Sequence, residues 1–141
     1  GEISGHIFFA DRWFGCDDGA YAGARLLEIL SLQDDTAGQV FDQLKTGVTT
    51  PALYIDASDD NKFALIDALT ARAEQFAGGR PTTIDGLRVD FPDGWGLVRA
   101  SNTTPSLVAR FEGRDEEALE RVKNQFRKHL QAVDESLTLP F

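Results

Sequence analysis

Residues 95–105 read W-G-L-V-R-A-S-N-T-T-P and contain an abrupt change from an apolar strand pattern to a polar turn. Alternation places Leu97 and Arg99 on one face of the strand and Val98 on the other. The small polar residues that follow end at Pro105. The stretch therefore predicts a strand that leads into a tight polar turn, and the rest of the chain can be organised around it.

The chemistry of this turn favours an anion. Residues 99–104 combine three hydroxyls, one carboxamide and one guanidinium, with no acid among them. The guanidinium of Arg99 offers a planar fork of donors that matches phosphate oxygens. Hydroxyls and backbone N–H groups of a tight turn can complete an anion nest. We therefore predict a phosphate-binding loop at the end of the strand. The alternative is an ordinary hairpin turn, because Asn, Ser and Pro favour turns for local backbone reasons.

Length and charge limit the function classes. The chain has 141 residues, which suits one domain or one domain plus part of another. It is 42% hydrophobic, enough to form a core, and its formal net charge is -9. Nucleic acids and anionic membranes favour basic surfaces, so neither is expected as a partner. An anionic substrate would need a local positive site.

Cysteine and methionine usage give further expectations. Cys16 is the one cysteine, so no internal disulfide is possible, and a cytoplasmic location is expected. No apolar run is long enough to span a membrane, and no signal peptide is recognisable. The chain contains no Met, so we expect Gly1 to be a processed or truncated terminus.

Residues 1–44 are predicted to form a first, incomplete unit. A helix is expected from Asp18, a good N-cap residue, to about Leu32. Its apolar stripe is wide enough to need partners on more than one side. A second, short helix is expected over residues 39–44. Its buried side chains are expected to be Val40, Phe41 and Leu44.

Residues 45–51, K-T-G-V-T-T-P, are predicted to link two units, because Gly47 and Pro51 interrupt regular structure. The sequence pattern changes after this segment. The domains are therefore predicted to be residues 1–44 and residues 45–141.

The second unit is predicted to be α+β, with an antiparallel sheet covered by helices on one face. Asp85-Gly86 is a hairpin signal between two of its strands. Period-two alternation predicts strands over residues 53–57, 82–84, 87–91, 95–99 and 105–112.

Two helices are predicted to cover this sheet. The first is expected to continue to about Ala77. Its apolar face is expected to carry Phe63, Ile66, Leu69, Ala73 and Phe76. The second begins near Asp115, and His129 lies near its C-terminal end, where a proton would suit the helix dipole.

A second polar loop stands at the start of the chain, where residues 1–6 read G-E-I-S-G-H. Together with R-A-S-N-T-T-P at residues 99–105, this loop resembles the α-D-phosphohexomutase family, specifically its phosphomannomutase/phosphoglucomutase branch. The resemblance covers essentially the whole chain. It implies that residues 1–44 end an α/β third domain and that residues 45–141 form a fourth domain with a TATA-box-binding-protein-like fold.

The resemblance also implies site residues. The substrate phosphate would be held by Arg99, Ser101, Asn102 and Thr103. Sugar hydroxyls would be held by Glu2 and Ser4, and His6 would contact the substrate or transfer a proton. For Glu2 the alternative is a solvated terminal acid, and for His6 it is a loop-orienting role.

A phosphohexomutase moves phosphate between C1 and C6 of glucose or mannose phosphates, through glucose 1,6-bisphosphate and with Mg²⁺, and it supplies exopolysaccharide precursors. The family's phosphoserine and its D-G-D-G-D-R magnesium loop belong to earlier domains and have no counterpart here. We therefore expect no catalytic residue and no metal ligand in this chain, and at most phosphate or sulfate bound to it. We expect it to be inactive alone, to work with the remaining mutase domains, and to close over the substrate by rotating about residues 45–51.

Three alternatives remain open at this point. The chain could be a stand-alone sugar-phosphate-binding module. It could associate with itself through surface left bare by the missing part of the third domain. It could also be part of a phosphoglucosamine mutase, although that branch usually has Gln in the first loop.

Overall fold

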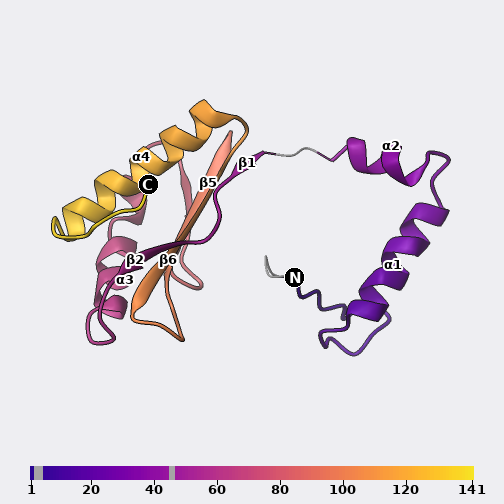
Figure 1. Cartoon of the computed structure of the whole chain (residues 1–141), viewed down its shortest axis with the longest axis horizontal. Helices are drawn as coiled ribbons and strands as arrows, with labels where there is room; N and C mark the ends of the chain where they lie inside the picture. The colour runs from indigo at the N-terminus through magenta and orange to yellow at the C-terminus, as the bar shows by residue number, and fades with distance from the viewer. Residues whose placement is uncertain (2–4, 45–46) are drawn as a thin grey trace. The chain divides into compact units, whose positions relative to one another are not determined.

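The computed structural model describes residue 1, residues 5–44 and residues 47–141. The chain divides into two compact units, Gly1–Lys45 and Thr46–Phe141 (Figure 1).

The first unit is a loop followed by two helices. Helix α1, Gly19–Ser31, begins where the Asp18 carboxylate accepts a hydrogen bond from the Tyr21 N–H, as its N-cap chemistry predicts. Helix α2, Ala37–Asp42, begins with a capping box between Thr36 and Gln39.

None of the apolar side chains described in the first unit is buried. The prediction that Phe41 and Leu44 are buried is wrong, since both are exposed. On α1, Leu27 is 68% exposed and Ile29 is 51% exposed. The two helices are amphipathic, but the described part of this unit provides no layer for their apolar faces to pack against.

The second unit is an antiparallel sheet with helices on one face, as the sequence predicts (Figure 1). The strand order is β1-β6-β5-β4-β3, and β2 also pairs with β6. The strands are β1 Val48–Thr49, β2 Leu53–Asp56, β3 Arg80–Thr82, β4 Leu87–Phe91, β5 Gly94–Ala100 and β6 Ser106–Gly113. The long central pair β5 and β6 is the hairpin predicted from residues 95–105.

Helices α3, Lys62–Thr70, and α4, Glu116–Val133, lie against the inner face of this sheet (Figure 1). The core contains alternate residues of the strands together with apolar side chains of both helices. Its largest fully buried members are Phe111, Phe126, Ile55, Leu69, Leu87, Leu107 and Leu130. Helix α4 begins at the N-cap Asp115, whose pKa is lowered chiefly by the hydrogen bond from the Ala118 N–H.

Three details of the second unit differ from the sequence prediction. Helix α3 ends at Thr70, and a short 3₁₀ helix, Ala73–Gln75, follows it. The residues predicted for the apolar face of this helix are buried except Phe63, which is 55% exposed. Strand β3 is Arg80–Thr82, so it shares only Thr82 with the strand predicted over residues 82–84, and Ile84 stands in the turn and is 93% exposed.

The segment that links the two units is shorter than the predicted residues 45–51. Val48 and Thr49 form β1, which pairs with Gly113 and Glu112 of β6. The Thr50 hydroxyl accepts a hydrogen bond from the Phe111 N–H. Residues 48–50 are therefore part of the sheet. Periodicity could not reveal this, because a two-residue strand has no measurable alternation.

Candidate functional site

The polar turn between β5 and β6 is closed by backbone hydrogen bonds. The Ser101 N–H donates to the Ser106 carbonyl at 2.9 Å, and the Ser106 N–H donates to the Thr104 carbonyl at 2.9 Å. These bonds continue the β5–β6 hairpin beyond its last ladder pair, Ala100 with Leu107. The turn is thus fixed directly to the two longest strands of the sheet.

Ser101 supports the turn from inside. Only 6% of Ser101 is exposed, and its hydroxyl oxygen accepts hydrogen bonds from the Thr103 N–H at 3.3 Å and the Thr104 N–H at 3.1 Å. The Thr104 hydroxyl also donates to it at 2.7 Å. Local bonds of this kind are the reason that Ser favours turns. The Ser101 hydroxyl is therefore engaged in holding the turn together.

Asn102 and Thr103 form the exposed tip of the turn. Within the described part of the chain, neither side chain forms a hydrogen bond, in contrast with the side chains of Ser101 and Thr104. The two predicted phosphate contacts at the tip therefore face solvent, while the hydroxyl of Ser101 belongs to the support beneath them.

Arg99 projects from the last part of β5, on the face opposite the helices. Its side chain is 35% exposed, and Nη1 donates to the Ala100 carbonyl at 3.3 Å. Nε lies 4.0 Å from an Asp85 carboxylate oxygen. The sequence stretch itself contains no acid, but the turn before β4 brings this carboxylate close to the guanidinium.

Arg110 was not singled out from the sequence. It lies on β6 opposite Leu97 of β5, and so on the same open sheet face as Arg99. Its Nε is buried and has no hydrogen-bond partner in the described residues. The alternation of β6 could have indicated this position, since Arg110 falls between the inward-facing Ala109 and Phe111.

A third arginine on this open face is already engaged. Arg88 on β4 pairs with Asp90 at 2.7 Å, and its guanidinium lies 4.2 Å from the centre of the Trp95 ring. Trp95 therefore makes a cation–π contact with a neighbouring strand.

The other predicted loop is only partly described. Glu2 and Ser4, the two residues expected to hold sugar hydroxyls, lie outside the described residues. His6 lies in the first unit, and its Nε2 is 3.7 Å from an Asp17 carboxylate oxygen. Asp17 also forms an isolated antiparallel bridge with Phe8. The histidine thus lies beside the segment that leads into α1.

Ion pairs hold the connection between that loop and α1. Arg12, with a positive φ of 59°, forms two hydrogen bonds with the Glu28 carboxylate, at 3.0 and 2.8 Å. These bonds are the main reason that the pKa of Glu28 is lowered. Trp13 stacks on Tyr21 with ring centres 4.2 Å apart, so its role in the described structure is packing.

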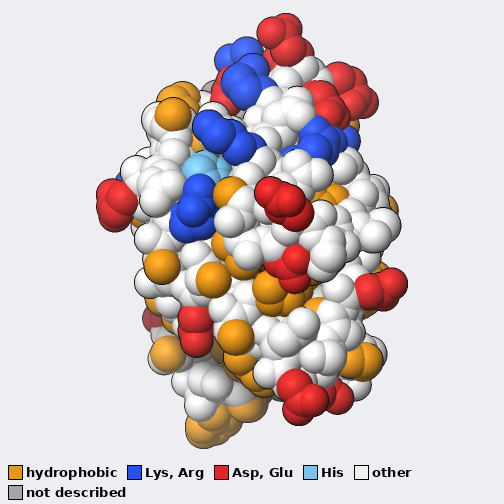
Figure 2. Space-filling view, turned by 90° about the vertical axis from the view of Figure 1, so that its left-hand side faces the viewer, with side chains coloured by type: hydrophobic (Ala, Val, Ile, Leu, Met, Phe, Trp, Pro, Cys, Tyr) orange, Lys and Arg blue, Asp and Glu red, His pale blue; other side chains and the backbone are white. Residues whose placement is uncertain are grey.

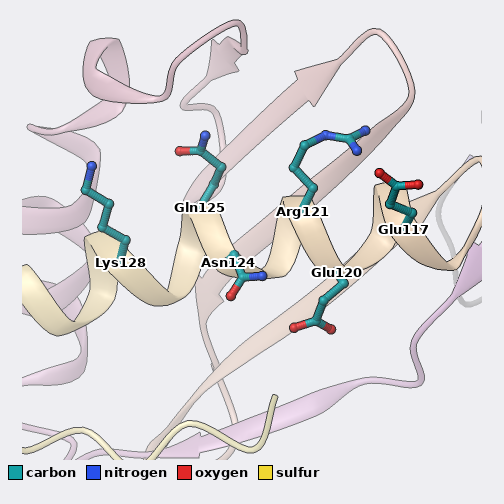
Figure 3. A pocket seen from close by; sticks show the side chains of 6 residues that line it. All are labelled: Glu117, Glu120, Arg121, Asn124, Gln125 and Lys128. Carbon is teal, nitrogen blue, oxygen red and sulfur yellow. The ribbon is translucent and has the colours of Figure 1, made fainter.

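A hollow along α4 does not form a convergent site. It has a volume of about 520 Å³ and is lined by side chains of α4 alone (Figure 3). Lys128, Gln125 and Arg121 point to one side of the helix, whereas Asn124 and Glu120 point to the other (Figure 3). Because these groups diverge and carry both signs of charge, they do not surround a ligand.

His129 does not have the role expected from its position. It is buried, and its ring stacks on Phe76 with centres 4.1 Å apart. Burial lowers the pKa of His129, and the cations Arg72 and Lys128 lower it further. Figure 2 shows a face on which several Lys and Arg side chains gather. The expectation that a proton on His129 suits the helix dipole is therefore wrong, because desolvation and neighbouring cations dominate.

The described residues contain no group of three or more His, Cys, Asp or Glu side chains that could hold a metal ion. Within the same described ranges, no helix has the length and apolar character needed to cross a bilayer.

Comparisons with known proteins agree with this architecture, in which a helical unit is followed by a sheet unit that carries a polar turn between β5 and β6. Residues 54–129 match the family model described as phosphoglucomutase/phosphomannomutase, C-terminal domain. Residues 1–46 match the model for the alpha/beta/alpha domain III of the same family. The chain belongs to the phosphoglucomutase/phosphomannomutase family.

Individual relatives are similar over long stretches. A phosphomannomutase/phosphoglucomutase of Pseudomonas aeruginosa is 56% identical over 141 residues, all of this chain and 30% of the relative. A phosphoglucomutase of Neisseria meningitidis is 56% identical over 128 residues, 90% of this chain and 28% of the relative. The chain therefore spans under a third of the length of these relatives.

A solved structure has the same fold. The crystal structure of a phosphoglucomutase/phosphomannomutase family protein from Burkholderia thailandensis superposes with a TM-score of 0.83 at 49% identity. The match covers all of this chain and 29% of that one. A probable phosphoglucosamine mutase of Methanocella arvoryzae is also similar, with 34% identity over 125 residues. The comparisons thus favour the branch that the sequence predicts.

Proposed function

We propose that the complete protein is a phosphohexomutase that interconverts hexose 1-phosphate and hexose 6-phosphate, and that this part binds the substrate phosphate. The proposal assigns phosphate binding to Arg99, Ser101, Asn102 and Thr103. One observation carries it: a guanidinium and two exposed polar side chains stand at the end of a rigid β-hairpin. The guanidinium would supply a charge-assisted bond, worth roughly 1.5–3 kcal/mol.

The open-face position of Arg110 supports the same assignment. A buried Nε without a partner is costly, so an incoming anion would gain from it as well as from Arg99. A phosphate held by these groups is bound and oriented without reaction, because no nucleophile or general base lies among them. We therefore assign the phosphoryl-transfer chemistry, including any step that uses Mg²⁺ or glucose 1,6-bisphosphate, to residues outside this chain.

For the N-terminal loop, we propose that Glu2 and Ser4 hold sugar hydroxyls and that His6 contacts the substrate. The proposal rests on the chemistry of the residues: a carboxylate accepts two hydrogen bonds, and a hydroxyl both donates and accepts. The 3- and 4-hydroxyls suit this role in an enzyme that accepts both glucose and mannose phosphates, because these sugars differ at C2.

We also propose that the second unit closes over the substrate in the complete protein, with the domain boundary between residues 44 and 45. Strand β1 limits where a hinge can lie, because residues 48–50 are bonded to β6. Gly47 is a poor place to stiffen the linker. A Cβ at this position would come within 2.6 Å of the Gly113 carbonyl, so a substitution there would disturb the sheet.

The exposed apolar side chains of α1 and its C-cap support a role for the rest of the protein as a partner. We propose that the remaining mutase domains cover Leu27, Ile29 and Leu32, which would otherwise stay in water. Association of two copies through these side chains is the alternative. Light scattering of the isolated chain distinguishes them, because a monomer contradicts self-association. We place the complete enzyme in the cytoplasm, where it would supply sugar phosphates for exopolysaccharide.

The test of phosphate binding is an amide-resolved NMR titration of the 141-residue chain with glucose 1-phosphate, with plain glucose as the control. We expect shifts at residues 99–104 that require the phosphate. Absence of shifts at millimolar ligand would contradict binding by the isolated chain. A mutase assay of the same sample should give no turnover above a blank without protein.

A further inference from the structure

Lys62 is a buried cation at the start of α3, and its ammonium group reaches the polar turn. Only 5% of Lys62 is exposed. Nζ donates to an Asp59 carboxylate oxygen at 2.7 Å and to the Thr104 carbonyl at 3.2 Å. An ammonium group taken out of water needs such partners, since an unpaired one is strongly disfavoured. One of these two hydrogen-bond acceptors is therefore a backbone oxygen of the candidate phosphate loop.

The segment that precedes α3 contacts this loop at a second point. The Ala57 N–H donates to the Pro105 carbonyl at 3.1 Å. Residues 57–62 thus bind two successive carbonyls, those of Thr104 and Pro105. These contacts are made by segments more than forty residues apart in the sequence, so no local pattern could reveal them.

The Thr104 carbonyl is a junction in the hydrogen bonds of the loop. It accepts from Lys62 and also from the Ser106 N–H. The N–H and hydroxyl of the same residue both donate to Ser101. A displacement of Thr104 would consequently disturb the support on which the exposed tip of the loop rests.

We propose that Lys62 is a positioning residue for phosphate binding: its ammonium group fixes the Thr104 carbonyl and adds a positive charge beneath the loop. The proposal rests on the proposed phosphate-binding function. The charge matters because the chain has a formal net charge of -9, which disfavours the approach of an anion. Asp59 is the exposed counter-ion of Lys62, and its negative charge partly offsets the positive charge that Lys62 adds beneath the loop.

Two variants separate positioning from simple structural support. Lys62→Met keeps an unbranched side chain but removes the charge and the bond to Thr104. Asp59→Asn removes the negative partner and keeps Lys62 next to Thr104. We expect opposite effects: Lys62→Met weakens phosphate binding, and Asp59→Asn leaves it equal or tighter. If Lys62 only stabilised the fold, loss of either member of the ion pair would act in the same direction.

The experiment is a titration of the ¹⁵N-labelled 141-residue chain and both variants with inorganic phosphate, followed at the amides of residues 99–104. We expect the Kd to rise about tenfold or more for Lys62→Met, the loss typical of one hydrogen bond to a charged group. Equal Kd values for the native chain and Lys62→Met would overturn the proposal. Equal weakening in both variants would also overturn it, because it would indicate a structural role.

A ligand-free measurement tests the positioning role when phosphate does not bind to the native chain. Hydrogen exchange should accelerate at the Thr103, Thr104 and Ser106 amides in Lys62→Met, while amides of α4 remain protected. Unchanged exchange at these three amides would contradict the proposal even if the loop binds phosphate. If Lys62→Met does not fold, Lys62→Gln, which keeps a donor amide without the charge, replaces it in both measurements.

Discussion

Gly86 lies against the backbone of Arg99, so closely that a Cβ built on Gly86 would come within 2.7 Å of the Arg99 Cα. The same Cβ would approach the Val98 carbonyl to 2.3 Å, and Gly86 has a φ of +75°. The turn before β4 therefore fits directly onto the part of β5 that carries the candidate phosphate ligand. A side chain at Gly86 would have to move Arg99.

Gly86→Ala is expected to destabilise the second unit by about 1–3 kcal/mol, because the substitution adds a steric clash to an unfavourable φ. It should also weaken phosphate binding by displacing Arg99. Gly78→Ala is the matched control, since Gly78 also has a φ of +75° but its Cβ would meet nothing within 4 Å. Urea unfolding and phosphate titration of both variants measure the difference. If Gly86→Ala and Gly78→Ala lost equal stability, the contact of the added methyl group with Arg99 would not contribute to the destabilisation.

Ser101 and Asn102 are adjacent but are expected to respond differently to truncation. Ser101→Ala removes the acceptor of the Thr103 and Thr104 N–H groups, so we expect a loss of about 0.5–1.5 kcal/mol of folding free energy for each of these bonds. Asn102→Ala removes an exposed side chain and should change stability by about 0.5 kcal/mol or less. Phosphate affinity should fall in both variants. A stable Ser101→Ala variant would contradict the supporting role of this hydroxyl.

Asp85 is the carboxylate nearest to Arg99 in the described structure, with 4.0 Å between Nε and its oxygen. Because the pair is exposed, its stabilising effect is small, roughly 0–1 kcal/mol. Asp85→Asn should nevertheless tighten phosphate binding by up to about fivefold, the same energy expressed as affinity, because the anion no longer competes with a carboxylate. The gain should shrink at high salt. Weaker binding in this variant would indicate that Asp85 orients Arg99 rather than competing for it.

The sequence predicts the strands of the central hairpin well because alternation over residues 95–112 is long and one face is buried. It fails where contacts are not local. The strand β1 exists only through its pairing with β6, and the exposure of Phe63 depends on how α3 lies on the sheet. Secondary structure of this kind is decided by tertiary packing, which propensity does not contain.

The candidate site shows the same division. Arg99, Asn102 and Thr103 could be proposed as phosphate ligands from the residue types of one stretch. Lys62 and Asp85 could not, because they reach the loop and Arg99 from other parts of the chain. Lys62 would look from the sequence like one more solvated helix residue, and its burial is the property that distinguishes it.

His129 gives a prediction on the pH dependence of stability. Burial beside Phe76 and the cations Arg72 and Lys128 lowers its pKa in the folded state below the ordinary value of 6.5. The unfolded chain therefore binds a proton first as the pH falls. The contribution of His129 to stability is complete above pH 6.5 and is lost as the pH decreases from 6.5 toward the folded pKa.

We expect the urea concentration at the unfolding midpoint of the second unit to decrease as the pH is lowered from 7.5 to 5.5. His129→Phe should reduce this decrease, because a phenyl ring keeps the stacking on Phe76 and cannot be protonated. Lys128→Gln is the graded control. It removes one of the two cations, so it should raise the pKa of His129 and give an intermediate pH dependence. If the native chain and His129→Phe lost stability equally over this interval, a different group would have to be responsible, and the buried histidine would be protonated as readily in the folded chain as in the unfolded one.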